Sequence, residues 1–501
     1  REVLALKKLF SKKVSPVLIA VILGAVLVCA LIPLFAQAKY MIPWYDDYNY
    51  ARYNRSFRLA YGDTFINLMR GVLFQVRESW YAWQGTFASI FLMALCPIAW
   101  GEQYYRYGGM ALIALFAVSV VFMMYSLCKE MFGMKRASSL GIAFLTALLT
   151  IERMYFPGHG FYWFNGGVHY IGIHSFLMLL VGVIVLLSAK KGILSTVLQV
   201  FFGMVLALIV SGGNYVSLLE GAIILFALVL YTAFKYKKAA FRLIPVVMVY
   251  IIGFYMNASA PGNSVRSSYF VGSAYGPIDA VIHSFPEGMK MVRKFSDHFL
   301  LAVLIALIPM AWCGLKDSKV KFRWPIVFAL FMAGLYFASY TAPLYGMGSV
   351  MQARIWNVNK LMYQLALVLS EIYIIGWIKR KVSDKGRKFS LDIGYWWFYA
   401  GLTVLLLGLF IGKGRERYYY SSYGAFYDIH SAESGLLYSE YLDRIEDINS
   451  QGPDAYVKPY TCRPWYLRQT DISENPAEEP NRAMADWYGK NSITLLPEET
   501  K

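Results

Sequence analysis

Two adjacent carboxylates, Asp46 and Asp47, lie within an aromatic segment at residues 40–50. A carboxylate that aromatic neighbours partly desolvate has a raised pKa, which suits a general base. The same pair offers the oxygen ligands that a divalent metal such as Mg²⁺ or Mn²⁺ prefers. If a helix begins just after Pro43, however, the pair would only satisfy free backbone N–H groups and the helix dipole. The sequence leaves a general base, a metal site and a structural cap open.

The elements that must position this doublet are membrane helices. The chain has 501 residues, of which 58% are hydrophobic and 16% are charged. Average soluble domains are about 45–50% apolar and about 25% charged, so we expect a bilayer protein and exclude a disordered or disulfide-stapled secreted one. Apolar runs of spanning length, roughly 17–25 residues, predict an all-α polytopic membrane protein with eleven helices. These runs lie at residues 17–38, 109–128, 137–156, 168–188, 192–210, 216–234, 241–257, 298–314, 324–340, 358–378 and 392–412.

Basic residues orient these helices, because cytoplasmic loops carry an excess of Lys and Arg. With a cytoplasmic N-terminus, the predicted inner segments hold 24 of the 48 basic residues and 5 of the 31 acidic residues. The net charge of +17 is therefore a topology signal and gives no support for nucleic-acid binding. A shorter apolar run at 86–99 is interpreted as re-entrant or interfacial, although a twelve-helix arrangement stays open.

The inner loops are short and basic, so we expect the chemistry on the outer face. The first outer loop, 39–108, and the tail, 413–501, are the longest outer segments. The tail is predicted as a small extracytoplasmic α/β domain, with strands at 455–460 and 492–496 and one apolar helical face. That face carries residues 437, 441, 445 and 448.

This organisation resembles the GT-C glycosyltransferases, which have one N-terminal helix, a first outer loop opening with an acidic doublet, many further helices and a soluble tail. Within that superfamily the chain is similar to a bacterial group with a Trp-rich first loop, a Trp-Phe-Asn-Gly stretch and an Ala-Pro-Gly-Asn motif. These stand here at 80–85, 163–166 and 260–263. The resemblance covers the transmembrane domain, 1–412.

The resemblance implies an inverting glycosyltransferase in a cell membrane. Such an enzyme moves a sugar from a polyprenyl-phosphate carrier to an extracytoplasmic glycan or cell-wall polymer. Asp46 or Asp47 would act as the general base, and the departing lipid phosphate would need cationic or metal stabilisation.

Other outer residues are candidates for substrate binding. An Arg fork matches phosphate oxygens, so an Arg that follows a turn at the bilayer surface is a phosphate candidate. Each candidate has a plainer alternative, such as a solvated Arg, a structural His or a paired buried acid. The predicted substrate-binding residues are His159, Trp163, His169, Asn214, Glu220, Asn263, Arg266 and Arg354.

Two other functions are open from the sequence. One is a transporter of lipid-linked glycans or polysaccharides, and the other is a Wzy-like glycan polymerase. A transporter should show charged or broken helices in paired halves. One acid, Glu371, lies near the midplane of a predicted helix, and the sequence has no internal repeat.

Overall fold

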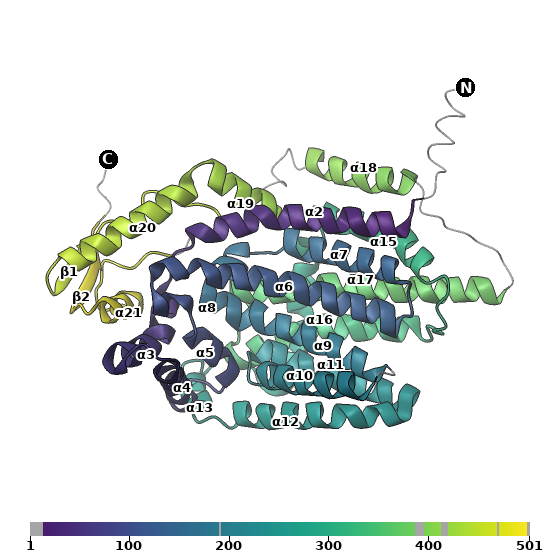
Figure 1. The fold of residues 1–501 in the computed structure, drawn as a ribbon, viewed down its shortest axis with the longest axis horizontal. Coiled ribbons are helices and arrows are strands. Elements are labelled where there is room, and N and C mark those ends of the chain that lie inside the picture. The colour runs from purple at the N-terminus through teal and green to yellow at the C-terminus, as the bar shows by residue number, and fades with distance from the viewer. Residues whose placement is uncertain (1–13, 190–191, 386–394, 412–418, 468–469, 498–501) are drawn as a thin grey trace.

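A computed structural model of the chain describes residues 14–189, 192–385, 395–411, 419–467 and 470–497. Long helices lie side by side in one bundle, and short helices gather with two strands at one end of it (Figure 1). We call this the α3 end. The elements are α2 (Pro16–Gln37), α3 (Tyr45–Tyr61), α4 (Phe65–Ala82), α5 (Phe87–Ala94), α6 (Arg106–Ser126), α7 (Arg136–Glu152), α8 (Phe164–Gly167), α9 (Ile173–Ser188), α10 (Ile193–Ser211), α11 (Tyr215–Tyr236), α12 (Ile244–Ala258), α13 (Gly262–Ser268), α14 (Pro277–Phe295), α15 (His298–Gly314), α16 (Pro325–Met347), α17 (Ala353–Asp384), α18 (Tyr395–Ile411), α19 (Ser421–His430), α20 (Glu433–Ser450), β1 (Asp454–Val457), α21 (Glu479–Tyr488) and β2 (Ser492–Leu495).

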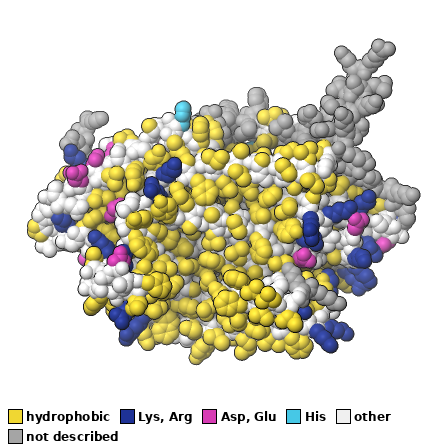
Figure 2. Space-filling view, in the orientation of Figure 1, with side chains coloured by type: hydrophobic (Ala, Val, Ile, Leu, Met, Phe, Trp, Pro, Cys, Tyr) yellow, Lys and Arg dark blue, Asp and Glu magenta, His cyan; other side chains and the backbone are white. Residues whose placement is uncertain are grey.

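The bundle is that of a multi-pass membrane protein. Within the described residues, seven helical stretches are long and apolar enough to cross a bilayer, and an eighth results if α14 and α15, bent by 85°, form one span. Figure 2 shows hydrophobic side chains covering the visible face of the bundle, with Lys and Arg gathered near its two ends. A helix lies in each of the eleven predicted ranges. The number of eleven spans stays a prediction.

The apolar run at 86–99 forms α5 and a short 3-10 turn. With eight residues and a rise of 1.5 Å per residue, α5 is about 12 Å long, far less than the roughly 30 Å of the hydrocarbon core. Instead of crossing, it packs against α3 and α4, where the Asn54 side chain donates to the Ala94 carbonyl oxygen at 3.0 Å. This segment supports the first outer loop from beneath.

The tail packs on the bundle at the α3 end. Helix α19 contacts α2, α21 contacts α3, and the buried apolar residues of the tail belong to the same cluster as those of the bundle. Asp428 of α19 accepts hydrogen bonds from the Gln37 side chain of α2, at 3.3 Å, and from the Tyr466 backbone N–H, at 2.9 Å. Strands β1 and β2 pair in parallel, with Ala455 opposite Ile493. The tail is thus fixed beside the start of α3.

Candidate functional site

Asp47 anchors the start of α3. Trp44 is the N-cap residue, and its backbone N–H donates to Asp47 Oδ2 at 2.8 Å. The Tyr105 hydroxyl donates to the same oxygen at 2.7 Å, and the Asn165 backbone N–H donates to Oδ1 at 3.0 Å. Burial raises the pKa of Asp47 to about 7, and these donors oppose the rise. Asp47 therefore has the capping role that the sequence left open.

Asp46 has a different environment. No described residue donates a hydrogen bond to its carboxylate. Burial raises its pKa to about 6, while the charge of Arg354 lowers it and that of Glu479 raises it further. The Asn165 side chain holds the main chain here by donating to the Asp46 carbonyl oxygen at 2.7 Å. A carboxylate with open oxygens and this pKa is mostly ionised at pH 7 and can accept a proton.

The stretch at 163–166 packs directly on the doublet. Besides the two bonds from Asn165, the Phe164 backbone N–H donates to the Tyr105 hydroxyl oxygen at 3.1 Å. Gly166 leaves room for the indole of Trp163, since a Cβ at Gly166 would lie 2.1 Å from that ring. This tight packing gives a physical reason for the order of residues in the stretch.

The segments at 80–85 and 260–263 also pack against each other. Asn263 Oδ1 accepts from the Gly85 backbone N–H at 2.8 Å and from the Tyr215 hydroxyl at 2.6 Å. Its side-chain NH₂ group donates to the Asn257 carbonyl oxygen at 2.8 Å. A Cβ at Gly85 would lie 1.9 Å from that same carbonyl oxygen, so only glycine fits. Asn263, predicted to bind substrate, thus uses its amide to join two outer loops.

Arg354, at the start of α17, lies beside the doublet. Its guanidinium carbon is 5.2 Å from the centroid of the Trp163 ring and 5.8 Å from that of Tyr170, which are cation–π distances. The same charge lowers the pKa of Asp46 and of His159. A half-buried Arg held over aromatic faces keeps its donors available for an anion.

Arg266, on α13, approaches the same region from another side. Its guanidinium carbon is 5.7 Å from the centroid of the Trp83 ring. Burial raises the pKa of the Tyr50 hydroxyl on α3, the charge of Asp46 adds to this, and the charge of Arg266 opposes it. The charges of Arg266 and Asp46 therefore both act on the Tyr50 hydroxyl. Arg266 and Arg354, the two predicted arginines, thus both lie near the start of α3.

Buried polar atoms without partners surround this place. Among the described residues, nothing bonds to His159 Nδ1, His169 Nδ1, Trp163 Nε1 or Asn165 Oδ1. Burial, followed by the charge of Arg354, lowers the pKa of His159 to about 4, so its imidazole is neutral at pH 7. An unpaired buried polar atom costs about 1–3 kcal/mol. A ligand that supplied the missing partners here would recover this cost.

Asn214 and Glu220 have other surroundings. Asn214 caps α11 by accepting from the Ser217 backbone N–H at 3.0 Å, and it donates to the His169 carbonyl oxygen at 2.7 Å. Glu220 is fully buried one turn deeper, with Oε2 3.4 Å from Nδ1 of His174. Glu220 is not among the charges that act on Asp46. The structure places Asn214 at the edge of the site and Glu220 beneath it.

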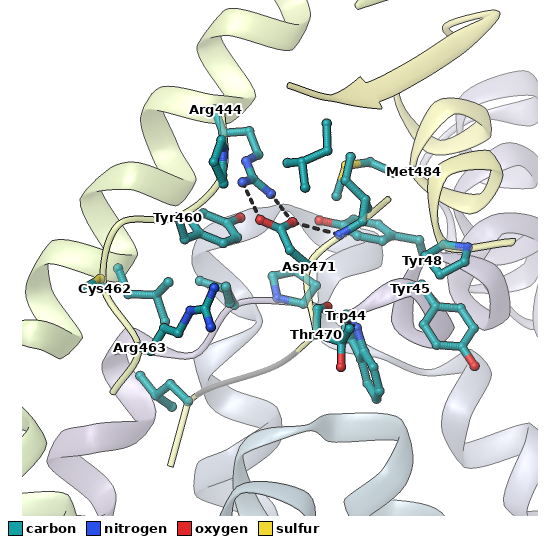
Figure 3. Close-up of a pocket in the computed structure, with 18 of the residues that line it drawn as sticks. Trp44, Tyr45, Tyr48, Arg444, Tyr460, Cys462, Arg463, Thr470, Asp471 and Met484 are labelled. Atoms are coloured by element: carbon teal, nitrogen blue, oxygen red, sulfur yellow. Dashed lines mark hydrogen bonds and ion pairs between the residues drawn. The ribbon is translucent and has the colours of Figure 1, made fainter. Parts of the chain in front are cut away.

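The tail contributes a residue that the sequence did not indicate. Glu479, the first residue of α21, acts on both Asp46 and Tyr45 through its charge. Next to it, a cavity of about 630 Å³ opens between the start of α3 and the tail (Figure 3). No local signal in the sequence links residue 479 to residue 46, because only the folded tail brings them together.

Metal binding by this site has little support from the donor set. No group of three or more His, Cys, Asp or Glu side chains that could hold an ion occurs within the described ranges. Of the doublet, Asp47 already accepts four hydrogen bonds, one of them from the Cys96 thiol at 3.9 Å, so Asp46 alone has open oxygens. The described residues therefore do not fit a protein-held Mg²⁺ or Mn²⁺ ion.

The fold and the site together define the class of this protein as a multi-pass helical membrane protein with a cluster of cationic and aromatic side chains at one end of its bundle. No family model and no curated protein sequence matches the chain.

Proposed function

We propose that this protein is an inverting glycosyltransferase that moves a sugar from a polyprenyl-phosphate carrier to an extracytoplasmic glycan or cell-envelope acceptor. The observation that carries this proposal is the placement of Asp46, whose carboxylate oxygens are open, within reach of the charge of Arg354 and among buried polar atoms without partners in the described residues. A base and a cation at one site are what transfer from a phosphate leaving group requires.

In the proposed reaction, Asp46 takes the proton of the acceptor hydroxyl while that oxygen bonds to the anomeric carbon. The bond from this carbon to the phosphate oxygen breaks at the same time, and its electron pair stays on the phosphate. Arg354 and Arg266 stabilise the resulting charge, because guanidinium donors match phosphate oxygens in pairs. Attack from the face opposite the phosphate inverts the configuration of the sugar.

The position of the two arginines supports a lipid-linked donor. Arg266 follows a long apolar helix and Arg354 begins one, so both stand where the bundle meets water and where a membrane lipid presents its phosphate. A transporter, in contrast, would need charged or broken helices at the midplane. The described contacts of Asp46 and Arg354 favour chemistry at the bundle end.

The proposal includes eleven spans, with the α3 end extracytoplasmic. The stretch Tyr215–Ala258 has 44 residues and, as a straight helix, would measure about 66 Å, twice the hydrocarbon core. Lys237, with φ of 41°, ends α11 and permits a return through α12. In cells expressing a cysteine-free background, a Cys at exposed Ser439 should react with an impermeant thiol reagent, and one at Lys381 should not. Labelling at Lys381 alone would reverse the orientation.

The function is tested with purified full-length protein in lipid nanodiscs and a panel of polyprenyl-phosphate sugars. We expect release of polyprenyl phosphate from at least one donor, and a loss of about 10²-fold or more in turnover for Asp46→Asn. Phosphate release that does not depend on Asp46 would contradict its role as base. No release from any donor, in the presence of mixed envelope glycans as acceptor, would contradict the glycosyltransferase.

A further inference from the structure

A cavity at the α3 end lies between the tail and the start of α3. Its volume of about 630 Å³ is within the roughly 300–1,000 Å³ of small-molecule sites. Figure 3 shows Trp44 and Tyr45 on one side, with Arg444, Tyr460 and Asp471 of the tail on the other. We propose that this cavity binds an uncharged oligosaccharide, the acceptor chain. This inference rests on the proposed function.

The cavity is lined by the residue that precedes the proposed base. Tyr45 lines it, and Asp46 is the next residue along α3. On the tail side, Pro480 lines the cavity, and its neighbour Glu479 acts electrostatically on both Tyr45 and Asp46. An acceptor in the cavity would therefore extend its end toward the Asp46 carboxylate, while the arginines hold the phosphate on the other side of that carboxylate.

The wall of the cavity has the composition that suits a sugar chain. Sugar rings have apolar C–H faces that pack on aromatic rings and hydroxyl edges that bond to planar polar groups. The aromatic members of the wall are Trp44, Tyr45, Tyr48 and Tyr460. Polar groups stand among them, including the Thr470 carbonyl oxygen, which accepts from the Trp44 indole N–H at 2.8 Å.

The charges of the wall favour an uncharged ligand. Arg444 is held by Asp471 through two hydrogen bonds of 2.6 and 2.8 Å, so its guanidinium is already neutralised. The other charged members among the described lining residues are Arg463 and Glu474, one of each sign. A polyanionic acceptor would need a surplus of open cationic groups, which this part of the described wall does not offer.

The tail holds the cavity in place. The Tyr441 hydroxyl donates to the Glu102 carboxylate, and the Tyr488 hydroxyl donates to its other oxygen at 3.0 Å. The Arg55 guanidinium of α3 lies 4.3 Å from the centroid of the Trp487 ring. These contacts fix α20 and α21 to the first outer loop, so the cavity is preformed rather than assembled by the ligand.

The test uses a cavity-filling substitution and a matched control. Thr470→Trp places an indole in the cavity, and the bond from Trp44 survives because it uses the Thr470 main chain. Ser439→Trp adds the same indole at an exposed position of α20 outside the cavity. Binding of maltotriose, cellotriose and triacetylchitotriose to the full chain in nanodiscs is measured by calorimetry, with trigalacturonate as the anionic comparison.

We expect at least one neutral trisaccharide to bind, Thr470→Trp to weaken it tenfold or more, and Ser439→Trp to leave it unchanged. If Thr470→Trp does not fold, Glu474→Ala, an exposed lining residue, should weaken binding severalfold. The proposal is overturned if no neutral trisaccharide binds, if trigalacturonate binds as tightly, or if the lining variants bind like the control. Release of polyprenyl phosphate by the wild type is measured in parallel with mixed envelope glycans as acceptor; its absence would contradict the proposed function and leave the binding result intact.

Discussion

Replacing each carboxylate of the doublet by its amide should change stability in opposite directions. Asp46 has a pKa of about 6 in the folded protein, compared with 3.8 for an ordinary Asp. One pKa unit corresponds to about 1.4 kcal/mol, so above pH 6 the ionised carboxylate lowers the free energy of unfolding by roughly 3 kcal/mol at most. Asp46→Asn removes this cost, and no described hydrogen bond is lost with it. We therefore expect a more stable, inactive protein.

Asp47→Asn should destabilise the protein. All four partners of the Asp47 carboxylate, the Cys96 thiol included, are donors, and an amide replaces one accepting oxygen by an NH₂ group. Whichever way the amide turns, one buried donor faces another donor. Losing one buried hydrogen bond in this way costs about 1–3 kcal/mol. This loss is the reason why Asp47→Asn should lower the free energy of unfolding.

The assay is the thermal midpoint of both variants in detergent micelles, followed by tryptophan fluorescence between pH 4 and pH 8. At pH 7, Asp46→Asn should melt above the wild type and Asp47→Asn below it. As the pH falls from about 6 to about 4, the wild type protonates Asp46, recovers the lost stability, and approaches the Asp46→Asn midpoint. A lower midpoint for Asp46→Asn at pH 7, or a difference that does not shrink in acid, would refute the assignment of open oxygens to Asp46.

Three further outcomes follow from the same geometry. Turnover should fall tenfold per pH unit below about pH 6, because the base must be ionised, and a profile flat to pH 4.5 would exclude Asp46. Arg354→Gln should shift the acid side of the pH profile to higher pH, because the Arg354 charge lowers the pKa of Asp46, and it should also reduce donor turnover. An unshifted profile would show that the Arg354 charge does not act on Asp46. Gly85→Ala should lower the thermal midpoint strongly, because its Cβ would lie 1.9 Å from a backbone carbonyl oxygen, and a stable variant would show that this loop can shift.

Part of the candidate site lies in patterns that can be read from the sequence. Apolar runs predicted the helices, the doublet and the two arginines were selected because their residue types suit the chemistry, and the stretch at 163–166 was selected through the family resemblance. The structural role of Asn214 can also be read from the sequence, because an Asn directly before an apolar run is a common N-cap. In the structure Asn214 is the N-cap of α11.

The contributions of the tail could not be predicted in this way. Glu479 lies 433 positions after Asp46, and the contact between their surroundings depends on the docking of α21 against α3. Such a contact is set by packing among distant segments, which hydrophobic periodicity does not specify. The tail was therefore expected as a separate small domain, whereas its buried residues join the main apolar cluster.

In the proposed mechanism, the two adjacent carboxylates divide two tasks that one carboxylate could not perform. Successive residues of a helix point about 100° apart, so a doublet in the first turn sends one side chain inward and its neighbour in another direction. The Asp47 oxygens accept hydrogen bonds from the helix start and from the Asn165 backbone, and the Asn165 side chain donates to the Asp46 carbonyl oxygen. These bonds anchor the backbone that carries Asp46. Asp46 can then stay free of hydrogen bonds, at a cost in stability, without becoming mobile. A single carboxylate that accepts several hydrogen bonds would be held in place but would be a poor base. A single carboxylate that accepts none would not be held in place.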